Sequence, residues 1–221
     1  MGDSYMDKRF MAILGAIIVL FGGIIFFTTR DSNNTTAEPS NHVMGNVSSK
    51  VTFLEYGDFQ CNACQAYNST VDAVRQKYAD KVKFQFRHLP LSSLHPNAIG
   101  ASRAAEAAGK QGKFWEMHDA LYKTANWQVW TAATDPNTYF QQYAQQLGLN
   151  VTQFKKDFLS SAVNDTINAD IATFEKTGQQ MATPTFFING TYISLDKLVD
   201  KNGPSVDAFS KYIDAELAKV E

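Results

Sequence analysis

The chain has 221 residues, of which 44% are hydrophobic, and its formal net charge at pH 7 is −2. This length is enough for one domain with a substantial apolar core and a short additional segment. The 22 Asp and Glu residues nearly balance the 20 Lys and Arg residues, so the sequence has no basic surplus for neutralising phosphates. Nucleic acid is therefore not an expected partner.

The first predicted element is an apolar segment near the amino terminus, residues 10–29. These 20 residues carry no charged side chain, and as a helix they would span about 30 Å, the thickness of a bilayer's hydrocarbon core. We expect an uncleaved transmembrane anchor, with a cleaved signal peptide as the alternative. Lys8 and Arg9 precede the segment and only Arg30 borders it afterwards, which places residues 1–9 in the cytoplasm by the positive-inside rule. The rest of the chain is then expected outside the cytosol.

A polar segment follows, residues 30–48, which is rich in Asn, Ser and Thr and has the composition of a flexible linker. A random coil of this length reaches about 25 Å on average, so the folded part is expected close to the membrane surface. We predict that residues 49–221 form the globular domain.

The globular part opens with a predicted strand at residues 51–56, an apolar β-prone run. A helix is expected next, with a buried stripe at steps of three and four that comprises Cys64, Tyr67, Val71, Val74 and Tyr78. The sequence KVKFQFRHL predicts a second strand, and amphipathic or Ala-rich patterns between about residues 96 and 178 predict a helical insertion.

The carboxyl-terminal part predicts a hairpin and a final helix. Two short strands around an Asn-Gly turn are expected at residues 186–188 and 191–193, and the helix at about 205–220. The order strand, helix, strand, helices, hairpin, helix is that of an α/β domain.

Cys61 and Cys64 are the only cysteines, and they lie between the first strand and the first helix of the domain. A zinc site normally takes four protein ligands, or three and a water. The histidines are scattered singly along the sequence, as His42, His88, His95 and His118. A structural disulfide across so short a loop would stabilise by only about 2 kcal/mol. Redox chemistry fits better than either alternative, because amide dipoles at a helix amino terminus stabilise a thiolate.

The phase of the helix separates the roles of the two cysteines. Cys64 lies on the stripe that packs inward, whereas Cys61 lies one turn earlier at the open end, where backbone N–H groups are unpaired. We therefore expect Cys61 to attack and Cys64 to resolve.

Four stretches resemble successive parts of the DsbA-like thiol-disulfide oxidoreductases: FLEYGDFQCNACQAY, FRHLPL, HPNAIGASRAAEAAGKQGKFWEMHDALY and ATPTFFINGTYI. The resemblance extends from about residue 47 to the carboxyl end. It implies a thioredoxin fold interrupted by an inserted helical domain, and dithiol-disulfide exchange with extracytoplasmic proteins. It also implies that Cys61 is the exposed nucleophile and Cys64 its buried partner.

The same resemblance assigns three further positions. Pro184 corresponds to a cis-proline that faces the disulfide, and Thr183 to the residue whose backbone pairs with bound peptide. Glu55 corresponds to the buried acid behind the active site. The sequence departs from the family in the Asn-Ala pair between the cysteines and in Ala182, where a glycine is common. Because the intervening pair affects thiolate stability, the reduction potential does not carry over.

Glu55 also has a physical interpretation. The period of two in a strand places it on one face with Val51 and Phe53, where burial would raise its carboxyl pKa. A buried acid could accept or relay the proton of Cys64 during exchange. The alternative is a solvated position at the end of an edge strand.

We expect a membrane-anchored, extracytoplasmic protein disulfide oxidoreductase that needs no cofactor. It would oxidise cysteine-containing exported proteins through a mixed disulfide at Cys61, and a membrane quinone-linked thiol oxidase would reoxidise it. A reductase or isomerase with the same residues is one alternative. A tethered peptide-binding or chaperone module, with incidental cysteines, is the other.

Overall fold

The computed structural model describes residues 37–220. Within this range, no helix is both long and apolar enough to cross a membrane. The predicted anchor at residues 10–29 and the predicted cytoplasmic segment at residues 1–9 lie outside the described residues.

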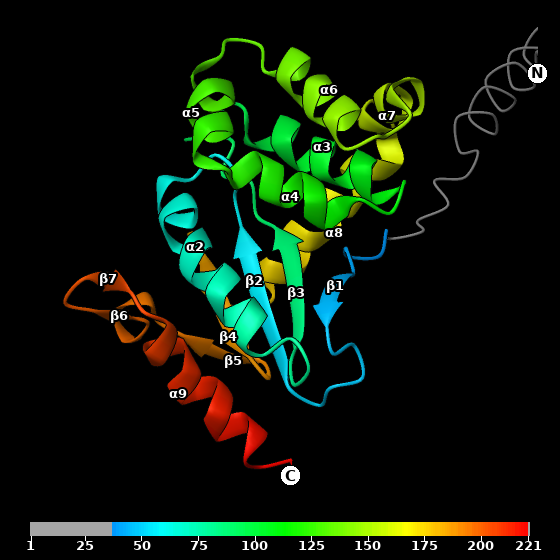
Figure 1. The fold of residues 1–221 in the computed structure, drawn as a ribbon. Coiled ribbons are helices and arrows are strands. Elements are labelled where there is room, and N and C mark those ends of the chain that lie inside the picture. The colour runs from blue at the N-terminus through cyan, green and yellow to red at the C-terminus, as the bar shows by residue number, and fades with distance from the viewer. Residues whose placement is uncertain (1–36, 221) are drawn as a thin grey trace, which may run out of the picture. The chain divides into compact units, whose positions relative to one another are not determined.

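A five-stranded sheet with the order β1-β3-β2-β4-β5 runs through the middle of the described domain (Figure 1). Its strands are β1 (His42–Gly45), β2 (Thr52–Gly57), β3 (Lys83–His88), β4 (Thr185–Ile188) and β5 (Thr191–Ile193). The central pair, β2 and β3, is parallel, and each of the other neighbouring pairs is antiparallel. The α/β class and the predicted strand pair with its connecting helix are confirmed.

Strand β1 corrects the prediction that residues 30–48 are a flexible linker. It pairs along its length with β3, from His42 opposite Phe86 to Gly45 opposite Lys83. β1 is a short edge strand without a fully buried residue, so its sequence lacks the apolar alternation that marks strands. The folded domain therefore begins before residue 49.

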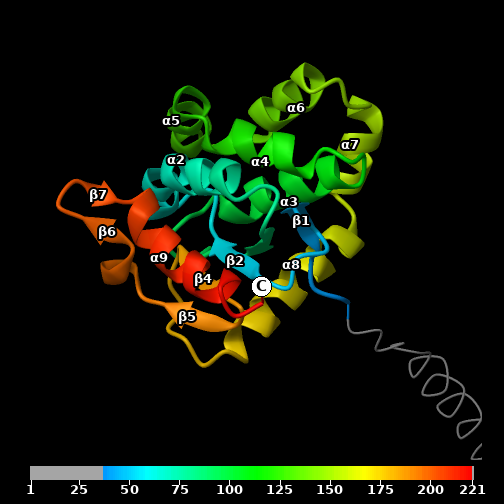
Figure 2. The ribbon, with the colours of Figure 1, turned by 60° about the horizontal axis from the view of Figure 1, so that its bottom comes forward.

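Helices cover both faces of the sheet, as Figures 1 and 2 show from two directions. On one face α2 (Asn62–Lys77) and α9 (Val206–Leu217) pack together on the strands, in a core that includes Val74, Phe84 and Phe209. On the opposite face α8 (Ser161–Glu175) brings Phe174 against the strands. Every second residue of β3 is buried, and Phe84 among them belongs to the core under α2 and α9.

The predicted helical insertion corresponds to the helices between β3 and β4, which lie beyond the carboxyl end of β3 except for α8 on the sheet face (Figure 1). Besides α8, the insertion contains five helices: α3 (Ala98–Gly109), α4 (Phe114–Tyr122), α5 (Thr124–Ala132), α6 (Asn137–Gln146) and α7 (Val151–Phe158). Two of them begin at side-chain caps: Asn150 accepts from the Gln153 amide and Ser160 from the Val163 amide. Both cysteines belong to the apolar core of this insertion, so the insertion contributes to the site.

The predicted hairpin forms β4 and β5 around Asn189 and Gly190, whose φ values are 49° and 76°. Both angles are positive, as a two-residue hairpin turn requires. A short 3-10 helix (Leu195–Lys197) and a ribbon of β6 (Val199–Asp200) and β7 (Gly203–Pro204) connect this hairpin to α9.

Candidate active site

The cysteine pair lies where β2 ends and α2 begins. Gly57 closes the strand, a three-residue loop follows, and Cys61 is the N-cap residue of α2 with an extended backbone. Its own side chain makes no capping hydrogen bond, which leaves the thiol next to the unpaired amides of the first turn. Cys64 follows one turn later on the inward face of the helix.

The two thiols differ in accessibility in the predicted order. The side chain of Cys64 is 1% exposed and that of Cys61 is 8% exposed, so the nucleophile expected to be open is itself largely covered. Both cysteines are free thiols. The Cys61 thiol faces the Thr183 carbonyl oxygen at 3.4 Å, and the Asp58 amide donates to the Cys64 sulfur at 3.5 Å.

These environments move the two thiol pKa values in opposite directions. A hydrogen bond from the Cys64 thiol is the main cause that lowers the pKa of Cys61 from 9.0 to about 5; burial opposes it, and the amides of Ala63 and Cys64 act in the same sense as the Cys64 thiol. Burial raises the pKa of Cys64 well above its usual value. At neutral pH the reduced pair therefore holds one thiolate, on Cys61, and one thiol, on Cys64.

Glu55 is buried on β2, as predicted, and the alternative of a solvated edge position is wrong. Glu55 is 8% exposed, and its strand β2 lies in the middle of the sheet, between β3 and β4. Burial raises the pKa of its carboxyl group from 4.5 to about 7, and the charge of Arg75 partly offsets this effect. The charge of Glu55 contributes in turn to the raised pKa of Cys64, so the two groups interact electrostatically. A carboxyl group that is half protonated near neutral pH is suited to proton transfer.

The peptide bond between Thr183 and Pro184 is cis, as the resemblance implied. The Thr183 carbonyl oxygen faces Cys61, while the Thr183 hydroxyl is buried without a hydrogen-bond partner among residues 37–220. The two preceding residues, Met181 and Ala182, are exposed. The fold thus brings the segment before β4 into contact with Cys61, although Thr183 and Cys61 are 122 positions apart in the sequence.

Asp58 organises the loop before Cys61, and the sequence analysis did not identify it. Its carboxylate accepts from the amides of Gln60 and Leu91, each at 2.8 Å, and it contacts the Nδ1 atom of His95 at 2.7 Å. The residue is fully buried. Its position directly after a predicted strand was the available signal, because a buried carboxylate there can bond to loop amides.

The insertion holds the main chain of the same loop. Tyr122 donates its hydroxyl to the Asp58 carbonyl oxygen at 3.1 Å, and Trp127 donates its indole N–H to the Phe59 carbonyl oxygen at 2.8 Å. The Gln60 side chain donates to the Thr131 carbonyl oxygen. Strand β2 and helix α2 present the cysteines, and the insertion fixes the loop between this strand and this helix.

The histidines that are scattered in the sequence are not isolated in the structure. His42 and His88 meet at Glu106, His95 pairs with Asp58, and the His118 Nδ1 atom lies 2.9 Å from the Asp119 carboxylate. His118 and Asp119 are sequence neighbours, but the other contacts join distant segments that only the fold brings together, so spacing along the chain cannot show them.

A family model described as thioredoxin matches residues 37–215. The chain belongs to the thioredoxin family. The matched range starts before β1, in agreement with the early start of the folded domain. The sequence prediction of a thioredoxin-like fold is confirmed.

Solved structures share this fold at low sequence identity. A thioredoxin-like oxidoreductase from Silicibacter pomeroyi is 23% identical with a TM-score of 0.63, and the match covers 86% of this chain and 99% of that one. Wolbachia pipientis α-DsbA1 is 22% identical with a TM-score of 0.65, covering 82% and 92%. Bacillus subtilis BdbD in its oxidised form is 23% identical with a TM-score of 0.63, covering 83% and 97%. The fold, including the insertion, is thus one found in DsbA-type proteins.

Curated relatives at higher identity are much longer proteins. A Na(+)/H(+) antiporter NhaA 1 of Mycolicibacterium vanbaalenii is 36% identical over 202 residues, which is 85% of this chain and 31% of the antiporter. A Na(+)/H(+) antiporter NhaA of Herminiimonas arsenicoxydans is 33% identical over 150 residues, covering 68% and 22%. This chain spans less than a third of the length of these relatives, so the similarity concerns one segment of each antiporter.

Proposed function

We propose that this protein is an extracytoplasmic protein disulfide oxidoreductase whose preferred direction is the oxidation of client dithiols. The observation that carries the proposal is the asymmetry of the pair: a Cys61 thiol with a pKa lowered to about 5 lies above a buried Cys64 thiol with a raised pKa. Such a pair has one attacking sulfur and one resolving sulfur, which a structural disulfide does not need.

The reaction is a two-step exchange at the Cys61 sulfur. A client thiolate attacks Cys61 of the Cys61–Cys64 disulfide, the bond to Cys64 breaks, and Cys64 leaves as a thiolate. A second client thiolate then attacks the client sulfur of the mixed disulfide and releases Cys61 as a thiolate. The client loses two electrons and gains one disulfide, and the enzyme pair takes up these electrons.

The low pKa of Cys61 supports the oxidising direction. A reduced pair is stabilised when one of its sulfurs is a thiolate held by hydrogen bonds, and a stabilised reduced form makes the disulfide a stronger oxidant. Cys61 is also the better leaving group in the second step, because a sulfur of low pKa leaves faster. A reductase or isomerase using the same residues would be favoured by the opposite balance.

Glu55 is proposed as the proton donor and acceptor for Cys64. Cys64 leaves as a thiolate in buried surroundings that strongly favour the protonated thiol, so a nearby acid would stabilise the leaving group. With its pKa near 7, Glu55 can give that proton during reduction and take it back during reoxidation. Glu55→Gln should therefore slow exchange without unfolding the protein.

Thr183 and Pro184 are proposed to hold the client next to Cys61. The Thr183 carbonyl oxygen faces Cys61, and the preceding residues Met181 and Ala182 are exposed. Because Pro184 has no N–H, neighbouring backbone groups of this segment are free to pair with an extended peptide.

The proposed clients are cysteine-containing exported proteins, and the proposed reoxidant is a membrane quinone-linked thiol oxidase. Support comes from the uncharged segment at residues 10–29 and the positive charges before it, which are features of an anchor with the domain outside the cytosol. Protease added to intact spheroplasts should then digest the domain. Protection of the domain, or a mature amino terminus beyond residue 29, would contradict this location.

Trapping of mixed disulfides tests the mechanism. Cys64→Ala should accumulate reductant-sensitive adducts with client proteins, because Cys61 still attacks and no internal thiol releases the product. Cys61→Ala is the matched control and should form none. Adducts that persist without Cys61, or retained client protection when both cysteines are removed, would favour the chaperone alternative.

Equilibration with glutathione tests the direction. We expect a reduction potential above that of the glutathione pool, closer to about −120 mV than to the roughly −270 mV of thioredoxin. The Cys61 thiol should react with iodoacetamide in a pH profile whose midpoint lies near pH 5, its lowered pKa. A potential at or below that of thioredoxin would assign the protein as a reductase.

A further inference from the structure

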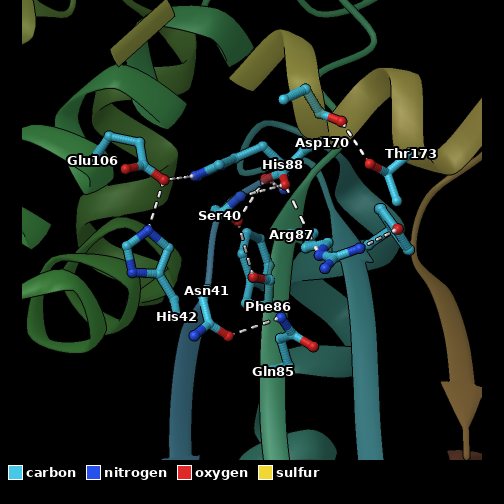
Figure 3. Close-up of polar contacts among 12 residues, drawn as sticks. Ser40, Asn41, His42, Gln85, Phe86, Arg87, His88, Glu106, Asp170 and Thr173 are labelled. Atoms are coloured by element: carbon cyan, nitrogen blue, oxygen red, sulfur yellow. Dashed lines mark hydrogen bonds and ion pairs between the residues drawn. The ribbon is translucent and has the colours of Figure 1, made fainter. Parts of the chain in front are cut away.

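Three side chains from separate segments meet on the side of the sheet next to β1 (Figure 3). The Glu106 Oε1 atom lies 2.6 Å from the His42 Nε2 atom and 2.8 Å from the His88 Nε2 atom. All three atoms lie within 4.8 Å of one another. His42 begins β1, His88 ends β3 and Glu106 lies in α3, so the meeting depends on the whole fold.

The two histidines of this trio are held in place by their surroundings. The His42 ring stacks on Phe114 with a centroid distance of 3.5 Å and an interplanar angle of 5°. Gly109 leaves room for that ring, since a Cβ atom there would lie 3.1 Å from the His42 Cε1 atom. His88 is fully buried, and its backbone amide donates to the Asp170 carboxylate at 2.9 Å. The two imidazole rings are therefore fixed in position before any ligand binds.

The polar contacts of this cluster converge on one oxygen atom and leave one ring nitrogen unused. Both imidazoles compete for one carboxylate oxygen, although that carboxylate has a second oxygen. The other ring nitrogen of His88, Nδ1, is buried and has no hydrogen-bond partner within residues 37–220. The Nδ1 atom is therefore free to carry the proton of the neutral ring when Nε2 binds an ion.

We propose that His42, His88 and Glu106 form a binding site for one divalent transition-metal ion, with zinc the best match. Two imidazole nitrogens and one carboxylate oxygen are a three-ligand set that zinc accepts, with a water in the fourth position. His42 is 19% exposed at its side chain, whereas His88 is fully covered, so the open position lies on the His42 side. No assigned cysteine chemistry uses these residues.

The ligand atoms would have to shift to hold the ion, because the two contacts to Glu106 are shorter than a zinc site requires and the ligand atoms otherwise lie within 4.8 Å of one another. Ligand atoms around a tetrahedral zinc ion lie about 3.3 Å apart, given zinc–nitrogen bonds of about 2.0 Å. The two observed contacts are 2.6 Å and 2.8 Å, so the ion would spread the atoms by about half an ångström. The edge strand that carries His42 and its partly exposed ring allow that movement. As zinc binds Nε2, the proton of each neutral ring moves to Nδ1, so both imidazoles stay neutral ligands.

The ion would connect β1, β3 and α3, and so tie the start of the domain to its insertion. Because the ligands converge only in the folded chain, zinc should stabilise the folded state. At free zinc one hundred times its dissociation constant, the ratio of folded to unfolded protein should rise about 100-fold.

The test uses the whole domain with Cys61 and Cys64 oxidised to a disulfide, because reduced thiols would bind zinc themselves. Protein stripped with a chelator is titrated with zinc sulfate in a calorimeter and melted with and without zinc. We expect one zinc per chain and a raised melting temperature. Absence of saturable binding to the oxidised wild-type protein would overturn the proposal.

Variants identify the ligands. His42→Phe keeps the stacking on Phe114 and Glu106→Gln keeps the shape of the side chain, and both should lose zinc binding and the zinc-dependent rise in melting temperature. His95→Gln is the matched control, because it removes a histidine paired with a different carboxylate, and it should keep both. Undiminished binding in His42→Phe and Glu106→Gln would mean that zinc binds elsewhere, which would also overturn the proposal.

Cobalt binding tests the site in the wild-type protein alone, so misfolding of a variant cannot affect the result. Added to oxidised wild-type protein, Co²⁺ should give the intense visible bands of four-coordinate nitrogen and oxygen ligation, and zinc should displace them in a 1:1 ratio. Only the weak bands of hydrated cobalt would overturn the site.

Discussion

Two buried glutamates in this domain are almost equally hidden and yet behave in opposite ways. Glu55, behind the cysteines, is 8% exposed, and burial raises its carboxyl pKa to about 7. Glu106, among the histidines, is 6% exposed; burial acts in the same direction, but hydrogen bonds to His42 and His88 outweigh it and lower the pKa to about 2. Burial alone therefore does not decide the charge of a carboxyl group, and its partners do.

This difference separates two roles for one residue type. A glutamate that is half protonated near neutral pH can exchange a proton with its neighbour, whereas a glutamate that stays ionised can only hold its partners. The region around Glu55 should therefore control chemistry, and the region around Glu106 should control stability.

Glu106→Ala should have the largest effect. The substitution leaves two imidazole N–H groups without their acceptor and creates a cavity, so we expect the free energy of unfolding to fall by about 4 kcal/mol. Urea denaturation with a chelator present measures it. Glu116→Ala is the control and should cost less than about 1 kcal/mol, because Glu116 is 44% exposed and pairs with Lys113 at the surface. A similar cost for both variants would erase the distinction between the two regions.

Glu55→Gln should show a smaller and pH-dependent effect. In the folded protein Glu55 stays protonated up to about pH 7, whereas in the unfolded chain it ionises near 4.5. Wild-type stability therefore falls as pH rises between these values, and that of the variant does not. At about pH 8 the variant should be more stable than the wild type by about 3 kcal/mol, and this gain should be absent at about pH 4.

Unfolding curves at several pH values measure this difference. The control is Glu116→Gln, which removes an exposed carboxyl group and should show no gain at high pH. An unchanged pH dependence in Glu55→Gln would mean that burial does not raise the carboxyl pKa of Glu55 in the folded protein.

Tyr122→Phe should have the smallest effect of the three. It removes one hydrogen bond, from the Tyr122 hydroxyl to the Asp58 carbonyl oxygen, and should cost about 1 kcal/mol. It should also change the rate at which Cys61 is alkylated, because the loop before Cys61 loses one of its anchors. Tyr143→Phe removes a hydroxyl contact elsewhere in the insertion, to the Asn126 carbonyl oxygen, and should leave that rate unchanged.

The sequence predicted the features whose signals are local. The spacing of Cys61 and Cys64, the phase of α2, and the Asn-Gly turn each depend on a few neighbouring residues, and the structure has them where they were expected. The burial of Glu55 also followed from alternation in one strand. The cis bond before Pro184 came from family resemblance and not from such a pattern.

The features that the sequence did not predict depend on contacts between distant segments. His42 meets Glu106 across 64 positions, and Ser40 meets Asp170 across 130. β1 was hidden because a four-residue edge strand in polar surroundings has the composition of a linker. The partial covering of Cys61 had no local signal either, because Thr183 reaches it from the other end of the domain.

The attachment of the first described residues has a mechanical consequence. Ser40 donates from its amide and its hydroxyl to the Asp170 carboxylate, at 2.8 Å and 2.6 Å, and β1 then pairs with β3 (Figure 3). A pulling force applied through the preceding residues would first load these bonds, and then the contact between His42 and Glu106. The loop that carries Cys61 makes none of these contacts. Tension on the start of the domain would therefore act on α8 and β3, while the thiols keep their geometry.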